Sequence, residues 1–438
     1  MRRLAAAALL ACFPAHALEL KPKAEVEARW FSEAPGAPLL GAVGATLEVF
    51  QPIGESQRIS GEFFQRWDEH DSARTHGDVR ELYWQQVGGV YELRIGARRV
   101  FWGVTESRHL VDIVNQSDFV ENVDAEDKLG QPMVNLALIP SFGTLDLFVM
   151  PYQRARTFAG REGYPRLPLQ VHAHEARYES ADAQEHLDYA ARYAGSFGPL
   201  DVGLSWFDGT AREPRLLPCL RRGARDANGD PFAGTADGPN CTLPESSQIP
   251  AQMGSILTML GVAPSAAQAQ AVFDNLVLVP QYDLLRQGGV DAQVVFGNLA
   301  LKVEGAWREQ QGRETRAAVS GFEYTFGDLW ATGADLGVIG EYLYDERGEF
   351  LGVLLDDEVF VGGRLAINDV AGSQLLAGVV GSRKRFENRL YGVEASRRLS
   401  DDWRLAIETR IFSKFDRSRI EGFLADQDFT MLTLERFF

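Results

Sequence analysis

Apolar and polar residues alternate one by one along most of this chain, and this period of two limits what it can fold into. The clearest segments are 90–101, 187–197, 299–309, 335–344 and 402–414. In one of them Leu301, Val303, Gly305 and Trp307 alternate with Lys302, Glu304 and Arg308. Because successive side chains of a strand point to opposite faces, each segment predicts a strand with one apolar and one polar face.

A soluble β-sandwich would show the same alternation, so other features decide between the two architectures. The polar faces carry full charges, which suits a wet lumen, and aromatic residues recur toward the segment ends. Short connections also alternate with long ones, which lie near 103–130, 153–183, 209–281, 345–357 and 415–426. These features favour an all-β protein, a transmembrane antiparallel β-barrel with long outer loops.

The pattern predicts about 18 strands, and 16 if one weak hairpin is misread. The strands are expected to start near residues 22, 41, 57, 78, 90, 131, 143, 184, 199, 282, 299, 314, 333, 357, 372, 387, 402 and 427. An even number of strands places both ends of the barrel chain on the same side of the membrane.

Composition excludes several other classes of protein. The 438 residues include 44 Lys and Arg against 61 Asp and Glu, a net charge of −17, which argues against a nucleic-acid partner. The hydrophobic share of 45% argues against a disordered chain, and 43 Gly with 11% aromatics suits a turn-rich β-protein.

Residues 1–17 resemble a secretory signal peptide. Arg2 and Arg3 precede an apolar run, and Ala15-His16-Ala17 forms a small-x-small cleavage site. The alternative is a lipoprotein signal, because Leu9-Leu10-Ala11-Cys12 resembles a lipoprotein cleavage box. We expect residues 18–438 to form a single barrel domain, with 209–281 as a long loop insertion.

Two further motifs resemble known protein families. The last ten residues, 429–438, resemble the terminal β-signal of Gram-negative outer-membrane proteins, with Phe438 as the final aromatic, although Arg436 departs from the usual apolar residue. The segments 93–103 and 112–118 are similar to a family of uncharacterised porin-like barrels that are distantly related to alginate-export-type porins. The resemblance implies a bacterial outer-membrane barrel and offers no catalytic residues.

No catalytic motif is present in the sequence, so we expect no enzyme activity and no cofactor. His172 and His174 are two residues apart and could share a metal ion on a strand face, although two loop histidines are the simpler interpretation.

The 209–281 loop holds the two cysteines of the mature chain. Cys219 and Cys241 are expected to form a disulfide in an exported protein. Asp226, Asn228 and Asp230 between them have the spacing of the start of a calcium loop, but a plain Asn-Gly turn is the simpler interpretation.

Two loop segments are expected to narrow the pore. An apolar helical stripe runs from Ile249 to Leu260, and Ser265 is expected to cap a helix over 266–273. We expect this stripe to cover or enter the barrel mouth, the alternative being a contact with a partner. The acidic loop 103–130 is the second candidate for an infolded segment, the alternative being a solvated loop that binds divalent cations among lipopolysaccharide.

The polar strand faces are expected to line a lumen of mixed charge. The predicted pore-lining residues are Arg58, Glu62, Arg66, Glu92, Arg94, Arg98, Lys302, Glu304, Arg308, Arg404, Glu408 and Arg410. These charges could form structural ion pairs along the wall, or they could orient a solute in the pore. Because arginine binds carboxylate and phosphate groups well, we expect some preference for anions.

The sequence therefore predicts a porin-like outer-membrane channel for passive diffusion of small polar, possibly anionic solutes. The expected partners are the lipid bilayer, lipopolysaccharide, the solute, and the barrel assembly machinery that reads the strand ending at Phe438. The alternatives are a barrel that acts through its loops in adhesion or assembly, and a rim-sited outer-membrane hydrolase.

Overall fold

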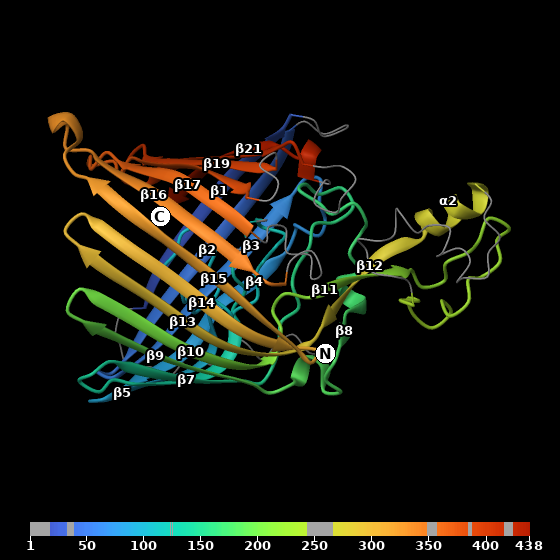
Figure 1. Cartoon of the computed structure of the whole chain (residues 1–438), viewed down its shortest axis with the longest axis horizontal. Helices are drawn as coiled ribbons and strands as arrows, with labels where there is room; N and C mark the ends of the chain where they lie inside the picture. The colour runs from blue at the N-terminus through green and yellow to red at the C-terminus, as the bar shows by residue number, and fades with distance from the viewer. Residues whose placement is uncertain are drawn as a thin grey trace.

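The computed structural model describes residues 18–32, 39–122, 124, 126–242, 266–347, 357–383, 388–415 and 424–438. Eighteen strands of these residues form one sheet that winds into a barrel (Figure 1). They are β1 (Glu19–Phe31), β2 (Leu39–Ile53), β3 (Gln57–Asp68), β4 (Gly77–Val87), β5 (Tyr91–Arg98), β6 (Gln131–Leu138), β7 (Thr144–Met150), β9 (Asp188–Phe197), β10 (Leu200–Thr210), β13 (Leu284–Phe296), β14 (Leu299–Gln310), β15 (Arg313–Phe326), β16 (Asp335–Asp345), β17 (Asp357–Ala366), β18 (Gln374–Ser382), β19 (Arg389–Arg398), β20 (Trp403–Ser413) and β21 (Phe429–Phe437).

Every barrel strand pairs antiparallel with its neighbours, and pairing of the first strand with the last closes the ring. β1 and β21 are in register from Lys23 opposite Phe437 to Phe31 opposite Phe429. The backbone N–H of Phe438 also donates to the carbonyl of Pro22. The predicted all-β, antiparallel barrel of 18 strands is therefore confirmed, and each observed barrel strand starts within four residues of its predicted position.

The outer surface of the barrel explains why the alternation predicts the strands well. Apolar side chains such as Val303 and Ile407 are about 40% exposed, whereas Glu304, between Val303 and Gly305, is buried. Exposed aromatics stand at the short turns, among them Phe142 and Phe296. This is the surface expected of a wall that contacts lipid outside and polar groups inside.

The last strand also shows how Arg436 fits into an apolar signal. Its guanidinium lies 5.4 Å from the Trp403 ring centre and 4.6 Å from that of Phe438. Stacking on aromatic faces lets a charged residue remain near an apolar surface.

The long connection between β10 and β13 carries structure of its own. β11 (Arg215–Leu220) and β12 (Leu276–Tyr282) pair antiparallel, and β8 (Arg177–Tyr178) adds a short parallel strand from the preceding loop. With α2 (Ala266–Asp274), this region extends beyond the barrel on the side of the long loops (Figure 1). A disulfide joins Cys219 to Cys241 within it.

Some expectations lie outside the described residues. These are the signal peptide with its lipoprotein alternative, the apolar stripe 249–260 and the cap at Ser265. No helix of the described part of the chain is long and apolar enough to cross a membrane.

Candidate functional site

The barrel interior is divided by the connection between β5 and β6, residues 99–130, which we call the inner loop. One carboxylate on the facing wall holds it. Glu304 of β14 accepts from the backbone N–H of Val104 at 2.8 Å and of Thr105 at 3.0 Å, and from the Thr105 hydroxyl at 2.7 Å. Its second oxygen accepts from the N–H of Leu110 at 2.7 Å. The inner loop is thus fixed across the lumen by charge-assisted hydrogen bonds, as expected for an infolded segment.

A second carboxylate extends this attachment. Glu341 of β16 accepts from the backbone N–H of Glu106 and of Ser107, both at 2.7 Å, and from the Ser107 hydroxyl at 2.6 Å. The carboxylate of Glu106 in turn pairs with Arg364 of β17 at 2.6 Å. The tip of the inner loop is therefore tied to two strands by groups of both charges.

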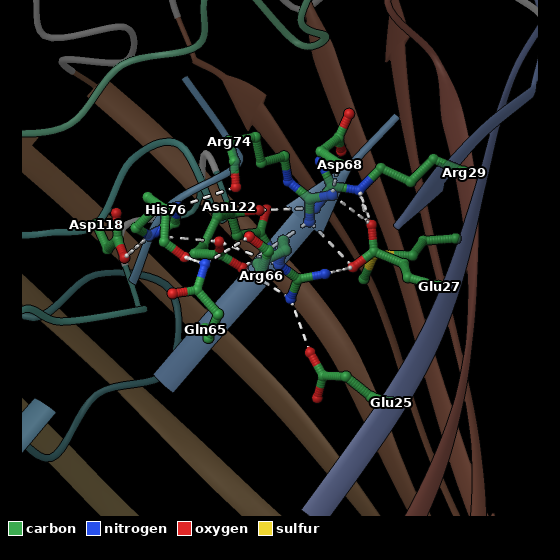
Figure 2. A network of polar contacts seen from close by, with 12 residues as sticks. Glu25, Glu27, Arg29, Gln65, Arg66, Asp68, Arg74, His76, Asp118 and Asn122 are labelled. Atoms are coloured by element: carbon green, nitrogen blue, oxygen red, sulfur yellow. Dashed lines mark hydrogen bonds and ion pairs between the residues drawn. The ribbon is translucent and has the colours of Figure 1, made fainter. Parts of the chain in front are cut away.

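On the opposite wall, a buried ionic network occupies part of the lumen (Figure 2). The guanidinium of Arg66 contacts Glu25, Glu27 and Glu121, each at 2.8 Å. Arg74 pairs with Glu27 at 2.8 Å. All five side chains are nearly inaccessible, and Glu121 belongs to the inner loop, so this network locks the loop to β1 and β3.

The network extends to two titratable side chains in the loops, His76 and Asp118. His76 Nε2 lies 3.3 Å from the carboxylate of Asp118. Although burial opposes ionisation, His76 and Arg80 lower the pKa of Asp118 to about 2. Burial also opposes charge on His76, but Asp118 raises its pKa above the usual value. Each partner of this pair therefore favours the charged form of the other.

The inner loop also carries an acid with a raised pKa. Burial raises the pKa of Glu126 to about 7, and the negative charges of Asp124 and Glu394 contribute to the shift. Asp124 itself pairs with Arg410 at 3.2 Å. Glu126 is therefore only partly ionised at neutral pH.

The space that remains is a cavity of about 930 Å³ between the inner loop, the loop after β7 and the wall formed by β17 to β20. Glu106, Asp124 and Glu126 of the inner loop line one side of it, and segment 158–172 lines another. Leu276 and Val277 of β12 line it too, so the long 211–283 connection contributes to its boundary.

The twelve residues predicted to line the pore fall into three groups. Three are buried where the inner loop meets the wall: Arg66, Glu304 and Arg308. Five lie on β3 and β5, where Arg94 pairs with Glu92 and Arg99 pairs with Glu62: Arg58, Glu62, Glu92, Arg94 and Arg98. Four lie on β14 and β20, and of the twelve only Arg410 lines the cavity: Lys302, Arg404, Glu408 and Arg410.

Sequence reasoning placed the charges on the strands but missed how many are covered. Arg308 illustrates the correction, because it is buried and donates to Gln287 at 2.7 Å and to Asp345 at 3.2 Å. A solute cannot reach such a side chain. The residues Glu25, Glu27 and Arg29 of β1 were missed altogether, although their spacing of two was visible in the sequence.

Within the described residues, two groups of side chains have the geometry to hold a metal ion. His172, His174 and Glu175 bring one ligand atom each within 4.8 Å of one another, in a short 3-10 turn rather than on a strand. His76, Asp118 and Glu121 do the same, but arginines already neutralise their carboxylates.

The calcium-like sequence in the long loop forms a turn. Asp226 accepts from the backbone N–H of Asn228 and of Asp230 at 2.9 and 2.8 Å. An aspartate that caps its own turn in this way explains the spacing without a metal ion.

Comparisons with known proteins add little detail to this picture. No family model matches the chain, and no curated protein matches it. Among solved structures, a mutant of the Rh. blastica porin is similar to this chain. The match covers 96% of this chain and 100% of the porin chain, at 10% identity and a TM-score of 0.42. A triple mutant of the Rhodopseudomonas blastica porin gives a TM-score of 0.41. The fold of this chain is shown by its own closed ring of eighteen antiparallel strands, which is a β-barrel.

Proposed function

We propose that this protein is a bacterial outer-membrane channel for passive diffusion of small polar solutes, with a preference for anions. The long loops face outward and the short turns face the periplasm. The observation that carries the proposal is a closed barrel whose interior is only partly filled, leaving a cavity of about 930 Å³ bounded by an anchored inner loop. An infolded loop of this kind limits the size of a solute and places charges beside its path.

The same geometry supports the expected partners. The exposed apolar outer face would contact lipid, with lipopolysaccharide around the outer loops, and the strand ending at Phe438 would be read by the assembly machinery. The preference for anions rests on Arg161, Arg166 and Arg221 at the cavity, which have no carboxylate partner among the described residues.

Planar-bilayer recording of the refolded protein tests the proposal. We expect stepwise conductance in potassium chloride and a reversal potential in a salt gradient that shows anion preference. Heat-modifiable migration on a gel serves as the folding control. A folded barrel that stays silent at all potentials, even after deletion of residues 209–281, would contradict the channel and favour the alternative of a loop-mediated adhesion or assembly partner.

A further inference from the structure

The wall of the cavity formed by β17 to β20 carries a group of apolar side chains on its lumen side, beside Glu394 and Arg410. Phe360, Leu376, Val380, Leu390 and Phe412 all line the cavity. Cross-strand register places Phe360 opposite Val380, Val380 opposite Leu390, and Leu390 opposite Phe412. Their neighbours along the strands, such as Val361, are exposed on the outer face of the barrel. We call these five lumen-side residues the apolar lane.

A row of glycines lets neighbouring side chains lie flat against the strand backbone. Gly362, Gly378 and Gly392 are paired directly across three strands. A Cβ atom would come within 2.5 Å of the Phe360 ring at Gly362 and within 2.4 Å of it at Gly378. At Gly392 it would come within 2.5 Å of the Arg410 guanidinium. The ring and the guanidinium therefore lie along the backbone instead of projecting into the lumen.

The cavity also has a positively charged side that is not neutralised. Arg161, Arg166 and Arg221 line it, and none of them has a carboxylate within ion-pair distance inside the cavity's described lining. Arg166 stacks on the Tyr164 ring at 4.8 Å, and Arg221 donates to Asn275 at 2.8 Å.

Three of the five carboxylates on the described lining are engaged in ion pairs, whereas Glu126 and Asp274 have no ion pair among the described residues. Glu106 pairs with Arg364, while Asp124 and Glu394 both pair with Arg410. On the described lining, three arginines without an ion pair therefore face two such carboxylates, of which Glu126 is only partly ionised at neutral pH. These arginines share the cavity with the apolar lane, and an apolar surface of this kind is unusual where it faces water.

We infer that the cavity binds small amphipathic monoanions, namely carboxylates or sulfonates that carry an apolar body. The body lies on the apolar lane and the anionic group meets the guanidinium groups of Arg161, Arg166 and Arg221. This inference rests on the proposed channel function and names its class of solute. A fully hydroxylated anion would find the same arginines but would leave the lane without an apolar partner, and a cation would meet unpaired positive charge.

Hexanoate, gluconate and hexylammonium test the inference. Hexanoate and gluconate share six carbons and one carboxylate and differ in the hydroxyl groups, whereas hexylammonium keeps the apolar chain and reverses the charge. Each is titrated against the potassium chloride current of single channels, and the Kd is obtained from the current block. Since each buried methylene favours binding, we expect hexanoate to bind at least about fivefold more tightly than either of the others.

Two sets of variants separate the lane from the arginines. The double change Leu376→Gln and Leu390→Gln should bring the Kd of hexanoate to that of gluconate, and Arg166→Gln should weaken both anions alike. Ala406→Gln places the same polar side chain on β20 outside the cavity lining and should change neither. Heat-modifiable migration confirms that each variant has folded.

The outcomes distinguish this inference from the channel function itself. Conductance without any preference for hexanoate over gluconate would overturn the lane and leave the channel intact. Tight binding of hexylammonium would overturn the assignment of charge. Absence of conductance in the folded protein would overturn the channel function.

Discussion

Glu304→Gln is the sharpest test of the inner loop, because one carboxylate holds it through four donors at 2.7 to 3.0 Å. Glutamine keeps the shape of the side chain and one accepting oxygen, which can still serve Val104 and Thr105. Its amide nitrogen then faces the backbone N–H of Leu110, donor against donor. Loss of one charge-assisted hydrogen bond and weakening of the others amounts to about 2–4 kcal/mol.

This free energy sets the size of the expected effect. It raises the population in which the loop has left the wall by about 30- to 1,000-fold. Trypsin cleavage after Arg108, which lies between the anchored residues, should accelerate accordingly where opening precedes cleavage. Single-channel records should show brief steps of higher conductance as the loop moves.

The matched control is Glu323→Gln. Glu323 lies on the adjacent strand β15 and accepts from Lys302 at 2.9 Å, without a described hydrogen bond to the inner loop. This variant should cleave and conduct like the natural protein. If Glu304→Gln behaves like Glu323→Gln in both assays, the carboxylate does not hold the loop and the reasoning fails.

Three further predictions concern the remaining ties of the lumen and its loops. Arg66→Gln leaves buried carboxylates without their shared partner, so the free energy of unfolding of the barrel should fall by about 3–5 kcal/mol. The barrel should then unfold at a lower temperature on semi-native gels, and an unchanged temperature would contradict the prediction. Because the raised pKa values of Glu126 and His76 make the folded state bind more protons, inner-loop stability should fall as pH rises from about 5 to 8. Hydrogen exchange of the loop amides should therefore accelerate over that range, and less so in Glu126→Gln; a rate that is flat after correction for intrinsic exchange would refute this. Replacing Cys219 and Cys241 by serine should destabilise the small sheet of β8, β11 and β12 by about 3 kcal/mol. Proteolysis of this region should accelerate, while the heat-modifiable migration of the barrel stays unchanged.

The strands were predictable because two different surroundings act on alternate residues. Lipid selects apolar side chains on one face and the lumen selects polar ones on the other, so the period of two survives in nearly every strand. The same reasoning applies to Glu25, Glu27 and Arg29, whose spacing was present in the sequence and was overlooked.

The inner loop is different, because its partners leave no trace in local periodicity. Glu304 lies about 200 residues from Thr105, and an isolated glutamate on a polar face looks the same whether it faces water or backbone N–H groups. Alternation tells which side of the wall a charge occupies, but whether a solute can touch it depends on what folds over it. Of the twelve residues predicted from alternation, Arg410 is the one that lines the cavity's described boundary. Arg161, Arg166 and Arg221, which have no carboxylate partner in the described part of the chain, lie in loops where no alternation exists. In the proposed channel, selectivity would therefore be decided by loop residues and by uncharged lumen positions such as Gly378 and Leu390, which the alternation of charged residues does not indicate.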